Sequence, residues 1–205
     1  MTRLWHATTA VLGLVALVGQ TILTADEGRS LVNLFSYFTI ESNILVVVTC
    51  ALLAIRPDRG GRAFGMLRLA SLTGITVTGI VYATVLAGNV DMTGVEWWLD
   101  KIFHYVVPIL TVVGFLALRP RTRLDWSALG GLAFPVLWLT YTLVRAQVAE
   151  PTFLLTPTQT APVPYGFLDA AESSAGAVAV VCVVLTAVFV ALGSAAIAYS
   201  RRASD

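Results

Sequence analysis

Side chains that could take part in chemistry gather in two apolar stretches of the chain. The first carries the sequence FSYFTIESN at residues 35–43, and the second carries Asp100, His104 and Pro108 at intervals of four residues. A hydroxyl beside an imidazole can act as a nucleophile, because the imidazole accepts the hydroxyl proton. Thr39 and His104 are therefore a candidate nucleophile and general base, provided that the fold brings them together.

Helical spacing predicts which polar groups accompany Thr39. Four polar residues of the first stretch fall within an arc of about 120° on a helix: Asn33, Ser36, Thr39 and Asn43. Of these, Ser36 and Asn43 are candidate hydrogen-bond donors to an oxyanion. Glu41, near the middle of the membrane, points nearly opposite to Thr39, and a helix with polar groups on two faces cannot face lipid on both. We therefore expect other helices or water around this helix, with Glu41 neutral or paired.

The second stretch places two further residues next to His104. Asp100 lies one helical turn before the histidine on the same face, so it is expected to orient the imidazole as the third member of a triad does. Pro108 lacks an N–H group, so the carbonyl of His104 loses its helical partner and a kink is expected there. The other histidine, His6, lies most of a membrane thickness away, which excludes a shared haem or metal ion. We predict neither a metal site nor a cofactor.

The composition indicates that these residues lie in a membrane. Of the 205 residues, 57% are apolar and 12% are charged, whereas soluble domains average about 45–50% and about 25%. The net charge of +1 provides no basic surface for nucleic acid. Six apolar stretches are long enough to cross about 30 Å of hydrocarbon as helices: residues 4–24, 31–55, 66–88, 99–118, 127–147 and 169–199. We predict an all-α bundle of six transmembrane helices, with residues 1–205 forming a single membrane domain.

The distribution of charge predicts how the spans are oriented. Ten of the 13 Lys and Arg residues lie near the chain ends or around residues 56–68 and 119–123, which an alternating topology places on one side. The other side carries most of the Asp and Glu residues. By the positive-inside rule, both termini are then cytoplasmic, and we expect a multi-pass protein of the plasma membrane.

The topology brings several polar residues to one level in the outer half of the membrane. Thr39 lies roughly 12 Å below the outer end of its span, and His104 lies roughly 8 Å below the outer end of its own. Five residues of the third, fifth and sixth spans reach a similar level: Tyr82, Tyr141, Arg145, Asp169 and Glu172. Arg145 is expected to extend outward or to pair with Asp169, and either Arg145 or Lys101 could attract a fatty-acid carboxylate.

A proline-rich segment connects the fifth and sixth spans. Residues 149–165 contain four of the eight prolines, so an ordered or extended loop is expected there. The segment also contains the apolar triplet Phe153-Leu154-Leu155, which is unusual in a solvated loop. It is interpreted either as a connector that rests on the membrane surface or as a lid over an outward-facing cavity.

The polar residues that the topology brings to one level in the outer half of the membrane are called the polar layer. The residues alone leave its role open. A threonine in a membrane helix commonly donates to the carbonyl four residues back, which here is that of Phe35. A single histidine often joins two helices through a hydrogen bond. The same layer therefore suits helix packing, lipid binding or transport without catalysis, or contact with a partner chain, as well as hydrolysis by Thr39 and His104.

Three motifs, in this order and spacing, resemble the androgen-induced-protein family of six-span membrane proteins. They are Phe35-Ser36-Tyr37-Phe38-Thr39, His104 followed by Pro108, and Pro164-Tyr165-Gly166-Phe167-Leu168-Asp169. The resemblance implies an intramembrane threonine hydrolase that cleaves fatty acid esters of hydroxy fatty acids, with Thr39 as nucleophile and His104 as base. Gly166 stands where the family typically has proline, and the gap from His104 to Pro108 is one residue shorter than in its animal members.

The excess of arginine over lysine, twelve to one, is typical of a GC-rich bacterial genome.

Overall fold

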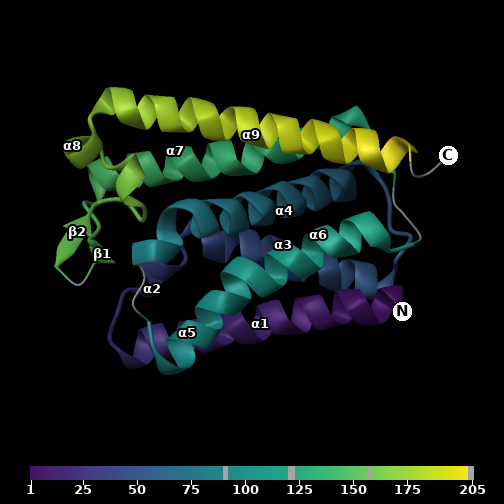
Figure 1. The fold of residues 1–205 in the computed structure, drawn as a ribbon, viewed down its shortest axis with the longest axis horizontal. Helices are drawn as coiled ribbons and strands as arrows, with labels where there is room; N and C mark the ends of the chain where they lie inside the picture. Colours follow the sequence, from purple (N-terminus) through teal and green to yellow (C-terminus); the bar gives the residue numbers. More distant parts are fainter. Residues whose placement is uncertain (90–91, 120–122, 157, 203–205) are drawn as a thin grey trace.

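The computed structural model describes residues 1–89, 92–119, 123–156 and 158–202. Within these residues, six apolar helices are long enough to cross a membrane, which confirms the predicted all-α bundle (Figure 1). Three spans are single helices: α1 (Thr2–Asp26), α3 (Phe38–Ile55) and α9 (Ala175–Arg202). Two spans contain π-helical turns: one is α4 (Arg62–Val81) followed by the π-helical turn η1 (Tyr82–Leu86) and the 3-10 turn η2 (Ala87–Asn89), and the other is the continuous run of α5 (Gly94–Lys101), the π-helical turn η3 (Ile102–Val106) and α6 (Val107–Ala117). The remaining span is the 3-10 helix η4 (Trp126–Leu132) followed by α7 (Ala133–Val148).

The second predicted span is not one continuous helix. Its first residues form the short helix α2 (Leu31–Leu34), and the chain becomes extended at Tyr37 (φ −72°, ψ 131°) before α3 begins at Phe38. The carbonyl of Ser36, which a continuous helix would pair internally, accepts from the indole Nε1 of Trp138 on α7 at 3.0 Å. The break in the span is therefore supported by a neighbouring helix.

The sixth predicted span also begins later than expected. Its first residues form the 3-10 turn η5 (Gly166–Leu168) and the short helix α8 (Ala170–Ser173). The carboxylate of Asp169 caps α8 by accepting from the N–H of Ala171 at 2.9 Å. The chain then passes through Ser174, which has a φ of 69°, and α9 follows. α9 presents several large apolar side chains outward, as a helix that faces lipid does.

A small β-hairpin follows α7, in the segment for which the sequence predicted an ordered or extended loop. β1 (Phe153–Thr156) pairs antiparallel with β2 (Gln159–Ala161), and Phe153 lies opposite Ala161. Phe153 is buried, and its ring meets that of Tyr37 edge to face with the centroids 5.4 Å apart. The hairpin therefore contacts the break between α2 and α3, at the end of the molecule opposite the termini (Figure 1).

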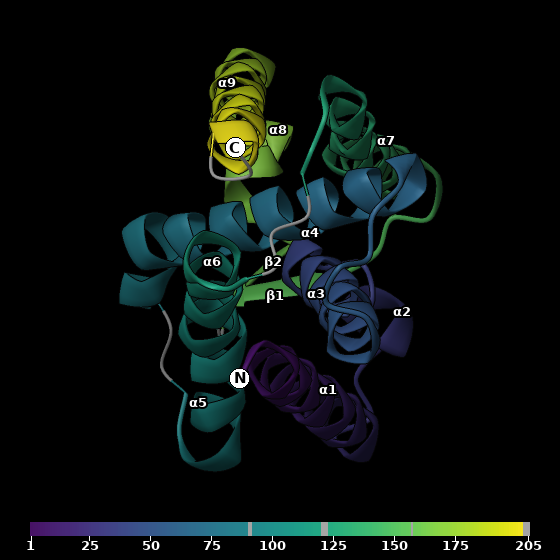
Figure 2. The same ribbon diagram turned by 90° about the vertical axis from the view of Figure 1, so that its right-hand side faces the viewer.

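Viewed along its long axis, the bundle has α4 in the middle (Figure 2). On one side α4 packs with α1, α3 and α6 through a cluster around Val46 and Ile75. On the other side it packs with α7 and α9 through a cluster that contains Val77, Trp138 and Phe189. α4 therefore packs against both halves of the bundle.

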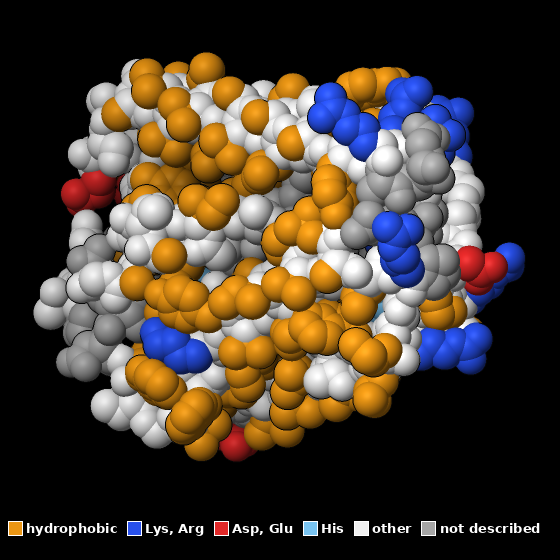
Figure 3. All heavy atoms as spheres, turned by 45° about the vertical axis from the view of Figure 1, so that its right-hand side comes forward, with side chains coloured by type: hydrophobic (Ala, Val, Ile, Leu, Met, Phe, Trp, Pro, Cys, Tyr) orange, Lys and Arg blue, Asp and Glu red, His pale blue; other side chains and the backbone are white. Residues whose placement is uncertain are grey.

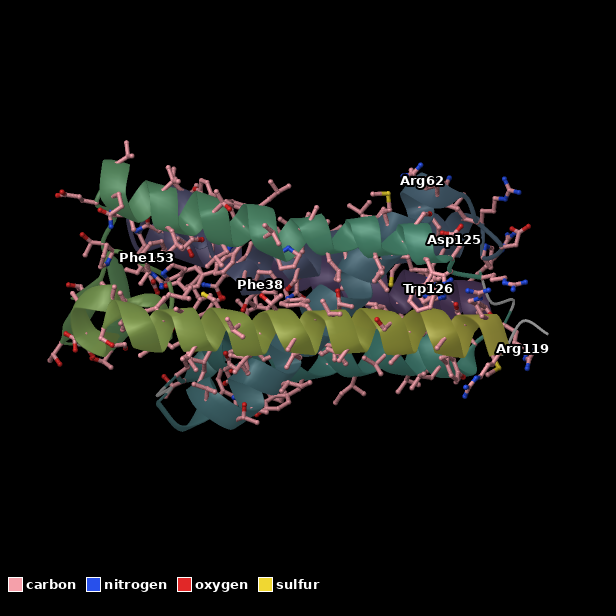
Figure 4. The ribbon with its side chains drawn as sticks, turned by 90° about the horizontal axis from the view of Figure 1, so that it is seen from above. Phe38, Arg62, Arg119, Asp125, Trp126 and Phe153 are labelled. Atoms are coloured by element: carbon pink, nitrogen blue, oxygen red, sulfur yellow. The ribbon has the colours of Figure 1, made fainter. Side chains whose placement is uncertain are left out.

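Apolar side chains cover the flank of the bundle, and charged side chains gather at its ends. Figure 3 shows Lys and Arg concentrated at the end that holds both termini, with hydrophobic side chains between the ends. Figure 4 places Arg62, Arg119, Asp125 and Trp126 at that end and Phe153 at the other. Both termini thus lie at the same end, as an even number of spans requires.

Gly131, in η4, lies where α4 leaves no room for a side chain. A Cβ at this position would come within 2.2 Å of the backbone oxygen of Met66 and within 3.1 Å of the backbone nitrogen of Ala70. We predict that Gly131→Ala lowers the free energy of unfolding by about 1–3 kcal/mol, because the two backbones must move apart. Unfolding in detergent measures this loss. The matched control is Gly176→Ala in α9, where a Cβ meets nothing within 4 Å; an equal loss in both variants would contradict the prediction.

Candidate active site

The structure brings Thr39 and His104 into direct contact. Oγ1 of Thr39 lies 3.2 Å from Nε2 of His104, and the threonine is buried, with 8% of its surface exposed. Thr39 is the second residue of α3, and the helix begins only at Phe38. Its hydroxyl therefore pairs with the histidine rather than with the carbonyl of Phe35, the usual partner within a continuous helix. A nucleophile and its base within hydrogen-bond reach is the arrangement that activation of a hydroxyl requires.

The surroundings of His104 determine which ring nitrogen carries the proton. Nδ1 lies 3.0 Å from the backbone oxygen of Asp100 and 2.9 Å from Oδ1 of its carboxylate. Both of these oxygens are acceptors, so Nδ1 carries the hydrogen. In the neutral ring, Nε2 then presents its lone pair to the hydroxyl of Thr39. Asp100 contacts the imidazole as the four-residue spacing in the sequence predicts.

A compact polar cluster surrounds the carboxylate of Asp100. Oδ2 accepts from the hydroxyl of Tyr82 and, at 2.9 Å, from Nζ of Lys101. Lys101 also donates to the Tyr82 hydroxyl at 2.8 Å. The ring of Tyr82 stacks on the imidazole of His104, with the centroids 3.9 Å apart and 13° between the planes. Both carboxylate oxygens of this buried residue therefore have partners, which a buried charge requires.

Tyr82 and His104 both lie in π-helical turns. η1 begins at Tyr82, and η3 has His104 at its centre. Gly79 lets the two helices approach here, since a Cβ on it would lie 3.3 Å from the backbone oxygen of His104 and 3.2 Å from Cβ of Pro108. π-Helical turns are frequent at functional sites. The distortion expected from Pro108 thus takes the form of a π-helical turn just before it.

Tyr165, which lies between the hairpin and η5, is a site residue that helical spacing did not identify. Its hydroxyl lies 3.3 Å from Oγ1 of Thr39 and accepts from the backbone N–H of Thr39 at 3.2 Å. Burial raises the pKa of Tyr165 to about 12, so its phenol keeps its proton at neutral pH. The signal for this residue in the sequence was the motif at residues 164–169, which the structure shows to be mainly loop and turn.

Ser36 and Asn43 have hydrogen-bond partners other than the hydroxyl of Thr39, and their role as oxyanion donors stays a prediction. Nδ2 of Asn43 donates to the backbone oxygen of Thr39 at 2.8 Å. The hydroxyl of Ser36 donates to the carbonyl of Val32 at 2.7 Å and lies 2.9 Å from the hydroxyl of Tyr141. The break before α3 removes Ser36 from the helical phase of Thr39, whereas Asn43 lies on α3 itself, four residues after Thr39.

Arg145 and Tyr141 belong to a separate polar cluster beneath the hairpin. The guanidinium of Arg145 donates to Oδ1 of Asn33 at 2.6 Å and to Oγ of Ser36 at 3.2 Å, and it lies over the ring of Phe153. Of the two arrangements expected for Arg145, extension outward or a pair with Asp169, the pair is not formed, and the carboxylate of Asp169 caps α8 instead. This cluster ties α7 to α2 and to the hairpin.

Glu41 lies in the first turn of α3. The sequence placed it near the middle of the membrane, because residues 31–55 were treated as one helix. The later start of α3 puts Glu41 in the first turn of that helix, two residues beyond Thr39, and its protonation or pairing within the membrane stays a prediction.

Two cavities meet at Thr39. The larger, of about 630 Å³, is called the polar cavity because more polar side chains line it than line the smaller one, although most of its wall is still carbon. Asp100 and His104 contribute to its wall, and the hairpin residues Leu154 and Leu155 also line it. The smaller, of about 250 Å³, is mostly apolar and lies among α3, α4, α7 and α9. Thr39 and Tyr165 line both cavities. This arrangement favours the interpretation of residues 149–165 as a cover over a cavity.

The function of this site is inferred from its side-chain contacts, since neither a metal cluster in the described part of the chain nor a related protein indicates it. Within the described ranges of the chain, no group of three or more His, Cys, Asp or Glu side chains is arranged to hold a metal ion. No protein-family model, curated protein or solved structure matches the chain. The contacts among Thr39, His104, Asp100 and Tyr165 are therefore the observations from which we infer the chemistry.

The buried hydroxyl of Tyr82 joins Asp100 to Lys101. We predict that Tyr82→Phe lowers the free energy of unfolding by about 1–3 kcal/mol, because the buried carboxylate loses a donor. Unfolding in detergent measures the change. The matched control is Tyr105→Phe, whose ring packs edge to face on Tyr82 with centroids 5.4 Å apart but whose hydroxyl lies outside the cluster. Both variants keep their rings, and only Tyr82→Phe removes a donor from the carboxylate, so a comparable loss in the control would contradict the prediction.

Proposed function

We propose that the protein is an intramembrane hydrolase that cleaves lipid esters, with Thr39 as nucleophile and His104 as general base. The observation that carries this proposal is the 3.2 Å contact between Oγ1 of Thr39 and Nε2 of His104, with Asp100 behind the imidazole. The position of these groups among long apolar helices favours a substrate that is itself a lipid. The resemblance to the androgen-induced-protein family extends the proposal to fatty acid esters of hydroxy fatty acids, or similar esters, as the substrate class.

In the first half-reaction, Nε2 of His104 takes the hydroxyl proton of Thr39 as Oγ1 attacks the carbonyl carbon of the ester. The carboxylate of Asp100 stabilises the imidazolium that forms. The bond between the carbonyl carbon and the alcohol oxygen then breaks, and Nε2 gives its proton to the departing alkoxide. The products are a free alcohol and an acyl group on Thr39.

In the second half-reaction, water attacks the acyl group from the polar cavity, which borders both Thr39 and His104. Nε2 takes a proton from the water as the new carbon–oxygen bond forms. The bond between the carbonyl carbon and Oγ1 then breaks, and the proton returns from Nε2 to Oγ1. The fatty acid leaves, and the site regains its starting state.

Tyr165 supports this reaction as a donor to the oxyanion. Its hydroxyl lies 3.3 Å from Oγ1 of Thr39, the atom that bonds to the carbonyl carbon. With a pKa of about 12, the phenol can donate to the oxyanion without losing its proton. The start of α3 at the same place adds the positive end of a helix dipole.

Ester hydrolysis by the purified protein in detergent tests the proposal. We expect Thr39→Ala and His104→Ala to lower the rate by about a thousandfold or more, because the members of such a triad act as a unit. Thr111→Ala is the matched control, since its hydroxyl donates to the carbonyl of Val107 on the helix that continues from His104. The control is expected to keep the parent rate. Equal rates in all four proteins would overturn the proposed pair.

A lipophilic fluorophosphonate separates catalysis from lipid binding alone. An activated Thr39 reacts covalently with this probe, so we expect a label on the parent protein and on Thr111→Ala but none on Thr39→Ala. A lipid-binding or transport protein that used the same polar layer would take up an ester without turnover and without a label. That result would favour the binding function over hydrolysis.

We also propose that both termini are cytoplasmic and that the protein lies in the plasma membrane. The support is the concentration of arginine at the end that holds the termini, which includes Arg62 and Arg119 (Figure 4). A fluorescent reporter that matures only in the cytoplasm is expected to be active when fused to the C-terminus. A secreted-type phosphatase fused at the same place is expected to be inactive, and the reverse pattern would contradict the orientation.

A further inference from the structure

We infer that the apolar cavity among α3, α4, α7 and α9 holds the acyl chain of the ester, and that the alcohol part lies in the polar cavity. The inference rests on the proposed function and deepens it, because it assigns each part of the substrate to one side of Thr39. It also identifies the residues of α7 and α9 that select the acyl chain.

The position of His104 determines which side of Thr39 the alcohol occupies. His104 lines the polar cavity, whereas the described wall of the apolar cavity does not include it. The departing alkoxide must take its proton from Nε2, so the alcohol leaves on the polar side. The water of the second half-reaction must reach the same nitrogen. The acyl chain stays on Thr39 through both half-reactions, and it therefore extends into the other cavity.

The wall of the apolar cavity suits an alkyl chain. Most of it is carbon surface, contributed by residues that include Val77, Trp138, Leu185 and Phe189. Two hydroxyl groups in the wall are already paired within the protein: Thr78 with Ser42 at 2.9 Å, and Thr186 with the carbonyl of Cys182 at 2.7 Å. Away from Thr39 and Tyr165, the wall thus favours a ligand without hydrogen-bonding groups.

The apolar cavity opens on the flank of the bundle. Val136 on α7 and Val190 on α9 line the cavity and are also exposed, by 61% and 48%. Figure 2 shows α7 and α9 standing apart above α4, and in Figure 4 Phe38 lies between these two helices. An acyl chain in the bilayer can therefore enter sideways between α7 and α9, with its ester reaching Thr39 last.

Photo-crosslinking in Thr39→Ala tests the position of the chain without requiring turnover. The probe is a palmitoyl ester with a diazirine near the end of the acyl chain. We expect it to label peptides of α7 and α9 that line the apolar cavity. Leu185→Trp, which fills the cavity, is expected to lower the yield about tenfold. Val183→Trp is the matched control on α9, because this side chain is 68% exposed and lies outside the cavity wall.

Labelling confined to the hairpin at residues 153–161, or an equal yield in the two tryptophan variants, would overturn the assignment of the cavity. Because Thr39→Ala is used throughout, this result does not depend on whether the protein hydrolyses esters. A protein that labels as expected but shows no hydrolysis would keep the acyl site and lose the proposed function.

The chain-length preference of the active protein provides the second measurement. Leu185→Trp is expected to lower kcat/KM for a palmitoyl ester about tenfold and to change that for a butyryl ester by less than about twofold. Val183→Trp is expected to leave both values close to those of the parent. An equal loss for the long and the short ester in Leu185→Trp would contradict the inference, since the substitution would then act on something other than the length of the acyl chain.

Discussion

The hydrocarbon of a bilayer offers no hydrogen-bonding solvent, so every backbone group that a helix break releases needs a partner within the protein. The break between α2 and α3 meets this constraint with partners from distant parts of the chain. The carbonyl of Ser36 accepts from the indole of Trp138, and the N–H of Thr39 donates to the hydroxyl of Tyr165. These contacts bring α7 and the segment before η5 to the start of α3. Thr39 thereby lies at the beginning of a helix, where its hydroxyl is available to His104.

The carboxylate of Asp100 also needs hydrogen-bond partners from within the protein. A carboxylate within a spanning helix is costly unless it is paired, and Asp100 accepts from Tyr82, Lys101 and His104. The two π-helical turns bring the rings of Tyr82 and His104 face to face. The imidazole consequently has a fixed tautomer and a fixed plane before any ligand arrives, and such preorganisation is what an electrostatic site requires.

The sequence predicted the features that depend on one segment at a time. Hydropathy predicted the six spans, and the four-residue spacing predicted the contact of Asp100 with His104, because both are properties of a single helix. The number of residues between each side chain and the outer end of its span predicted that Thr39 and His104 lie at a similar level in the membrane. It did not predict that the two side chains are in contact. The break before α3 depends on Trp138, which is 102 residues from Ser36, so helical phase misplaced Ser36. Tyr165 lies outside the regular helices and strands, where no periodicity could point to it.

In the proposed acyl site, the opening of the apolar cavity toward lipid changes how a chain is selected. An alkyl chain in the bilayer has already left water, and the gain of about 0.8 kcal/mol per methylene was made at that stage. Lipid tails are as apolar as the side chains of Val77 and Leu185, so transfer of the chain into the cavity gains little from the hydrophobic effect. Discrimination among chains must then come from shape and close packing against the wall. For the proposed hydrolase, the mole fraction of an ester in the membrane, rather than its aqueous concentration, would set how often the site meets its substrate.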